Sequence, residues 1–69
     1  MWTSEENLRT LDQLVDTFPI GAEVENFGFR ARVVGYKYSD SLQKYTGELV
    51  LSDSRCRWIA DTAKCSIVA

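Results

Sequence analysis

The first part of the chain has apolar side chains at three- and four-residue steps, the spacing of one face of a helix. Ser4 or Thr3 can cap this helix at its start. Pro19 ends it, because the residue before a proline avoids helical geometry. We therefore expect an α-helix over residues 4–18 that covers one end of the fold, and the alternative is a partner-binding helix anchored by Trp2. The apolar stripe consists of Leu8, Leu11, Leu14 or Val15, and Phe18.

After Gly21 the period of the pattern changes to two, which is typical of β-strands with one buried face. Polar turns separate the alternating segments, and residues 61–64 suit a single helical turn. The pattern leaves no room for a second long helix. The predicted fold is therefore a single mainly β domain over residues 1–69, with its strands in residues 22–68. The predicted strands are residues 22–27, 29–38, 45–52, 55–60 and 65–68.

The longest predicted strand has two distinct faces. Phe29, Ala31 and Val33 fall on one face, and the even-numbered residues fall on the other. Gly35 is the expected site of a bend or bulge, which a small barrel needs so that one strand can serve both of its halves. A bulge there would break the alignment of the even-numbered residues on either side of it.

The length of the chain limits the core that it can bury. At 69 residues, a domain buries only about 60% of the surface of its unfolded chain, so its stability should gain from a partner or a second copy. The formal charge of −2 is divided into −5 over residues 1–25 and +3 over residues 26–58, with the last residues neutral. A dimer in which the acidic helix of one chain meets the basic barrel of another is expected, and ordinary scatter of surface charge is the alternative.

The residue types exclude most catalytic and metal chemistry. The chain has no histidine, the commonest general base and metal ligand. Its glycines do not cluster as phosphate-binding loops require. Its two cysteines, Cys56 and Cys65, are too few for a disulfide framework and are expected to be free, buried thiols. The sequence thus predicts no enzyme, no cofactor and no metal site.

The sequence also indicates a cellular location. The longest apolar runs have three residues, such as residues 49–51, which is far too short to span a membrane. Glu5 and Glu6 stand where a signal peptide would carry positive charge. We therefore expect a cytoplasmic protein with no membrane partner.

Several short motifs, taken in order, resemble those of SH3-like small barrels. Residues 20–24 (Ile-Gly-Ala-Glu-Val) look like the opening hydrophobic-Gly-x-x-Val of that family, and residues 29–36, which end in Val-Gly-Tyr, look like its second strand. Residues 47–51, residues 57–59 and a short turn before residues 67–68 are similar to its closing strands. The resemblance covers about 48 residues. It implies a five-stranded SH3-like barrel that binds peptides, RNA, DNA or a protein surface.

Two subfamilies are disfavoured by particular residues. Plasmid-type dihydrofolate reductases carry Val-Gln-Ile-Tyr on a late strand, whereas residues 57–60 here are Arg-Trp-Ile-Ala. Peptide-binding SH3 domains have an acidic loop between their first strands, whereas the turn at residues 26–28 is too short for one. Short phage-encoded and other mobile-element proteins often have the same general look as this chain.

The remaining candidate for a function is a surface of basic and aromatic side chains. Arginine and aromatic residues are common at protein–protein hot spots, and together they also bind single-stranded nucleic acid. The acidic total charge favours a protein partner. We therefore predict a small non-enzymatic regulator or inhibitor that acts by protein–protein interaction, with a nucleic-acid-binding accessory protein as the alternative. The third possibility is that the aromatic side chains only pack in the core or at its rim, and that the arginines lie along apolar surface. The predicted site residues are Arg30, Arg32, Tyr36, Tyr38, Arg55 and Arg57.

Overall fold

The computed structural model describes residues 4–68, so the predicted roles of Trp2 and Thr3 lie outside the described residues. One helix precedes five strands, as the hydrophobic pattern predicted, and each predicted strand agrees with the structure to within two residues at either end. The elements are α1 (Ser4–Thr17), β1 (Glu23–Asn26), β2 (Phe29–Ser39), β3 (Lys44–Ser52), β4 (Arg57–Asp61), the 3₁₀ turn η1 (Thr62–Lys64) and β5 (Cys65–Ile67).

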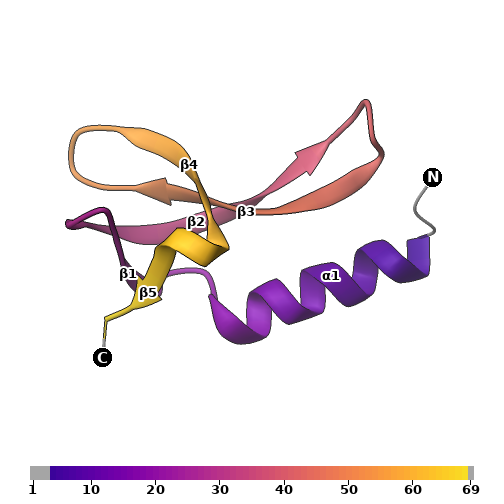
Figure 1. Cartoon of the computed structure of the whole chain (residues 1–69), viewed down its shortest axis with the longest axis horizontal. Coiled ribbons are helices and arrows are strands. Elements are labelled where there is room, and N and C mark those ends of the chain that lie inside the picture. The colour runs from indigo at the N-terminus through magenta and orange to yellow at the C-terminus, as the bar shows by residue number, and fades with distance from the viewer. Residues whose placement is uncertain (1–3, 69) are drawn as a thin grey trace.

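The helix α1 packs against β3 (Figure 1). Leu14 and Phe18 are buried, whereas Leu8 and Val15 are exposed, so only the C-terminal part of the predicted stripe reaches the core. The Asn7 side chain links the N-terminal part of α1 to the turn between β2 and β3, because its Nδ2 donates to the Gln43 carbonyl oxygen at 3.0 Å. Among residues 4–68 no helix has the length and apolarity needed to cross a bilayer.

The five strands form one open antiparallel sheet in the order β4-β3-β2-β1-β5. The predicted irregularity at Gly35 is confirmed, because the pairing of β2 with β3 shifts between Val33 and Gly35. A second shift follows between Tyr36 and Tyr38. Such bulges increase the local twist and bend of a strand. The pairs found among residues 4–68 do not join β4 to β5, so the sheet does not close into a barrel.

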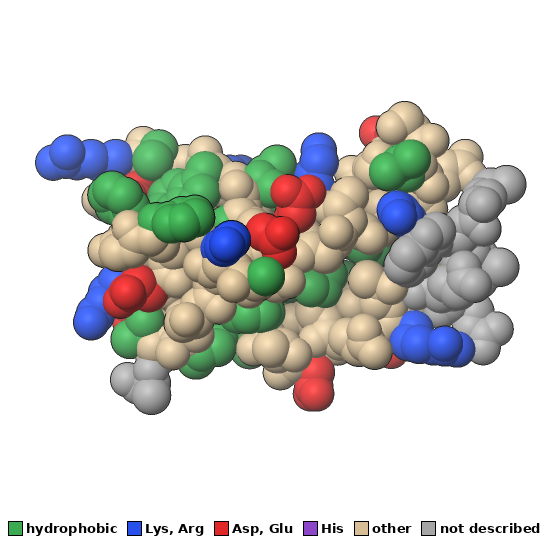
Figure 2. Space-filling view, viewed as in Figure 1, with side chains coloured by type: hydrophobic (Ala, Val, Ile, Leu, Met, Phe, Trp, Pro, Cys, Tyr) green, Lys and Arg blue, Asp and Glu red, His purple; other side chains and the backbone are tan. Residues whose placement is uncertain are grey.

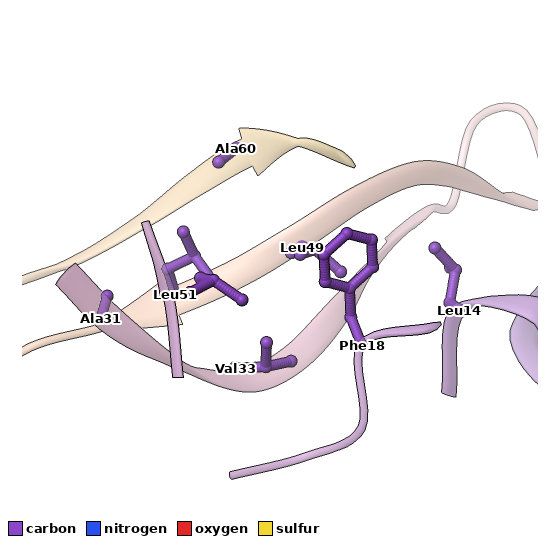
Figure 3. Packing of buried hydrophobic residues seen from close by; sticks show 8 residues of the cluster. Leu14, Phe18, Ala31, Val33, Leu49, Leu51 and Ala60 are labelled. Carbon is purple, nitrogen blue, oxygen red and sulfur yellow. The ribbon is translucent and has the colours of Figure 1, made fainter. Parts of the chain in front are cut away.

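The core lies between the helix and the inner face of the sheet (Figure 3). The buried residues of a strand occupy every second position, as Leu49 and Leu51 on β3 illustrate. Val24 is the core residue of β1. The helix lies along only part of this face, and the β1–β2 and β3–β4 turns extend beyond it at the opposite end from the N-terminus (Figure 1). The core residues are Leu14, Phe18, Val24, Ala31, Val33, Leu49, Leu51 and Ala60.

Candidate functional site

The turn between β1 and β2 consists of two residues, Phe27 and Gly28, which both have positive φ (52° and 83°). Two positive φ values are required by the type I′ turn, whose usual sequences are Asn-Gly, Asp-Gly and Gly-Gly. The left-handed conformation costs a residue with a Cβ about 1–2 kcal/mol. Glycine meets this requirement at no steric cost, whereas a phenylalanine does not. Phe27 therefore occupies a position where asparagine would favour folding more.

Asn26, directly before this turn, is a buried polar residue with an exposed fraction of 6%. Its Oδ1 accepts a hydrogen bond from the Trp58 indole Nε1 at 3.1 Å, and its Nδ2 donates to the Lys64 carbonyl oxygen at 3.1 Å. One side chain on β1 thus bonds to η1 and to β4, and β4 is separated from β1 by β3 and β2 in the order of the sheet. The hydrogen bond from the indole nitrogen of Trp58 to the buried Asn26 side chain holds Trp58 in place.

The turn between β3 and β4 is organised by Asp53. Its Oδ1 accepts hydrogen bonds from the backbone amides of Cys56 at 2.8 Å and Arg55 at 2.7 Å. The same two bonds, Cys56 first, hold the pKa of the Asp53 carboxyl below its usual range. The exposed carboxylate is therefore ionised at neutral pH.

These two turns enclose a pocket of about 390 Å³, which we call the aromatic pocket. Two of its walls are the exposed aromatic side chains Phe27 and Phe29, with exposed fractions of 76% and 67%. Figure 2 shows hydrophobic side chains grouped at the end of the molecule where the two turns lie, with basic side chains around them. The pocket lies at the end of the inner face of the sheet, where the helix does not cover that face. Its lining residues are Asn26, Phe27, Phe29, Asp53, Cys56 and Trp58.

The four predicted arginines lie at the same end of the sheet. Arg30 and Arg32 line a neighbouring groove of about 450 Å³, which shares Asp53 with the aromatic pocket. Arg55 is exposed in the β3–β4 turn, and Arg57 is exposed at the start of β4. The Arg32 guanidinium also has a local partner, because it donates to the Gly21 carbonyl oxygen at 2.9 Å.

The two predicted tyrosines do not join this group. The bulge at Gly35 breaks the alignment of the even-numbered residues of β2, as expected, and places Tyr36 on the other face from Arg30 and Arg32. The shift at Gly35 places Tyr36 opposite the buried Leu49, and its hydroxyl donates to the Phe18 carbonyl oxygen. Burial accordingly raises the pKa of that hydroxyl. Tyr38 lies beyond the second shift and packs edge-on against Tyr45, with ring centroids 5.0 Å apart.

Comparison of the chain with protein-family models, with curated proteins and with solved structures finds no match. The assignment of the candidate site therefore rests on the geometry described above.

The sequence interpretation missed the aromatic wall of this site. It placed Phe29 on the face of Ala31 and Val33, and the register agrees, because Phe29 pairs with Asn26 and Ala31 pairs with Val24. Phe29 is exposed nonetheless, since the core ends before it. The one signal available in the sequence was a phenylalanine directly before the turn glycine Gly28, where a small polar residue is usual.

Both cysteines are free, as predicted, but the expectation that both are buried is wrong for Cys56. Cys56 precedes β4 and lies exposed at the aromatic pocket, whereas Cys65 on β5 is half-buried beside Asn26. Among residues 4–68 no group of three or more cysteine and acidic side chains could hold a metal ion.

We expect the two thiols to differ clearly in reactivity. Desolvation, and then the charge of Asp61, raise the pKa of Cys65, which lowers its thiolate fraction at neutral pH. Iodoacetamide should therefore modify Cys56 severalfold faster than Cys65, as followed by mass spectrometry of peptides from the folded chain. Equal rates in the folded chain would contradict the placement of Cys65, and denatured chain provides the control in which the difference should disappear.

Proposed function

We propose that the chain is a non-enzymatic SH3-like binding module, a small regulator or inhibitor that acts by protein–protein interaction in a reducing compartment such as the cytoplasm. The strand order, the antiparallel pairing and the short η1 before the last strand support an SH3-like arrangement. The bond from Trp58 to Asn26 supports it too, because it joins strands that are not neighbours in the sheet. A sheet that brings β4 to β1 in this way is strongly curved.

The partner docks at the aromatic pocket in this proposal. The observation that carries it is the exposure of Phe27 and Phe29 on a pocket whose third aromatic wall, Trp58, is fixed by Asn26. Large aromatic side chains in well-defined pockets dominate binding energies at protein interfaces. Phe27 also destabilises its own turn, and such a cost is common where a residue serves binding. Neither phenylalanine contributes to the core of this chain.

A nucleic-acid partner is the second candidate, because the arginine-lined groove on the outer face of β2 shares Asp53 with the aromatic pocket. Exposed phenylalanines beside arginines can stack bases and bind phosphates. Asp53 opposes this function. Its ionised carboxylate lies on the linings of both the groove and the pocket, where it would repel phosphate. The geometry therefore favours a protein surface.

Capture from native lysate with purified, tagged chain tests this proposal. A protein partner should be retained equally with and without nuclease, and Phe29→Thr, which keeps a strand-forming residue, should abolish its capture. Leu42→Thr removes a similarly exposed side chain from the β2–β3 turn and should leave capture unchanged. Binding of a mixed-sequence oligonucleotide that weakens steeply with salt, together with nuclease-sensitive capture, would favour the nucleic-acid function instead.

A further inference from the structure

The strand β4 is an edge of the sheet, and its pairing partner among residues 4–68 is β3 alone. One row of backbone hydrogen-bonding groups along a sheet edge has no strand partner, and such an edge can pair with another chain. The side chains that point away from the core alternate in character along β4. They are the cation Arg57, the apolar Ile59, which has an exposed fraction of 47%, and the anion Asp61.

We propose that β4 pairs antiparallel with β4 of a second copy of the chain, around a twofold axis at Ile59. In this register Ile59 of one copy lies opposite Ile59 of the other, and Arg57 lies opposite Asp61 on both sides of the axis. A twofold contact of this kind is self-complementary, because each surface supplies both partners of every contact. The two sheets would become one continuous sheet.

Charge complementarity selects a second copy as the occupant of this edge. Charged side chains usually protect an edge strand from pairing, because they meet like charges or lose their hydration. Here the order cation, apolar, anion is complementary to its own reverse, so antiparallel pairing places opposite charges face to face. On the inner side, Trp58 would lie opposite the small Ala60, which leaves room for the indole ring that Asn26 already holds.

The other edge of the sheet does not offer the same contact. The strand β5 has three residues, Cys65–Ile67, and carries no charged side chain. It lacks a charge pattern that would fix a register. The proposed contact also differs from a meeting of the acidic helix with the basic part of the sheet, which would be a head-to-tail arrangement rather than a twofold one. A single pair of strands buries little surface, so the dimer should dissociate on dilution in the micromolar range.

Sedimentation velocity over a concentration series tests the pairing through charge reversal. Arg57→Asp places like charges opposite each other at both ends of the pair, and Asp61→Lys does the same with the opposite sign. Each variant alone should dimerise on the order of tenfold more weakly than the wild type. An equal mixture of the two variants should form a heterodimer, because every charge then faces its opposite. Wild-type chain that remains monomeric throughout, or a mixture that shows no heterodimer, overturns the proposal.

Asp61 also accepts a hydrogen bond from the Ala63 amide at 2.9 Å, so a second test avoids changing it. Ile59→Cys in a Cys56→Ser background should form a disulfide-linked dimer on mild oxidation, because directly paired residues have the Cα separation that a disulfide needs. Ile67→Cys in the same background is the matched control, since Ile67 on β5 is also 47% exposed. Equal cross-linking at both positions, or none at Ile59→Cys, contradicts the register at Ile59.

Discussion

Replacing Asn26 with alanine will destabilise the chain by about 3 kcal/mol. The substitution removes the acceptor of the Trp58 indole nitrogen and the donor to the Lys64 carbonyl oxygen, in a place that is largely closed to water. Each buried polar group left without a partner costs about 1–3 kcal/mol. The loss should appear as a lower free energy of unfolding in urea, and as a displaced indole NH signal of Trp58 in the NMR spectrum.

Asn7→Ala is the matched control for this prediction. The Asn7 side chain also makes two hydrogen bonds, to the Gln43 carbonyl oxygen at 3.0 Å and from the Tyr45 amide at 3.4 Å. Water can replace the exposed one of these bonds and can reach the other, so the substitution should cost about 1 kcal/mol or less. Equal losses for the two variants would show that Asn26 does not hold β1, β4 and η1 together.

Replacing Phe27 with asparagine will increase the free energy of unfolding by about 1 kcal/mol. Asparagine adopts the left-handed conformation more readily than phenylalanine, and Asn-Gly is the favoured sequence for a two-residue turn with two positive φ values. Phe27 is so exposed that its removal takes little from the core. Urea unfolding measures the change, and a loss of stability would mean that Phe27 packs against the fold rather than serving a partner.

The helix and the positions of the strands along the chain could be predicted from the sequence, because local rules determine them. The apolar stripe up to Phe18 and the break at Pro19 define α1, and the alternation of residues 29–33 defines the start of β2. Gly35 marked the bulge correctly. The face of Tyr36 could not be predicted, because it depends on the residue that the bulge inserts, and one inserted residue exchanges the two faces.

The aromatic pocket could not be predicted for a different reason. Alternation assigns Asn26, Phe29 and Trp58 to the inner face of their strands, but it does not say how far along that face the helix extends. Phe29 satisfies the pattern of a core residue and is nevertheless exposed. In the sequence, Asn26 is only a polar residue next to a turn. Nothing there indicates that its side chain forms hydrogen bonds with both a tryptophan from β4 and a carbonyl group of η1.

The affinity of the captured partner for Phe27→Asn chain, measured beside Gln43→Asn chain, shows whether the partner binds at the aromatic pocket. Gln43 also has a positive φ, 54°, but it lies in the β2–β3 turn and does not line the aromatic pocket. Both substitutions relieve a similar backbone conformation. Loss of an aromatic hot spot costs about 2 kcal/mol or more of binding free energy, so Phe27→Asn should weaken binding by about thirtyfold or more, whereas Gln43→Asn should leave it unchanged. Unchanged affinity for Phe27→Asn would mean that the partner does not bind at the aromatic pocket.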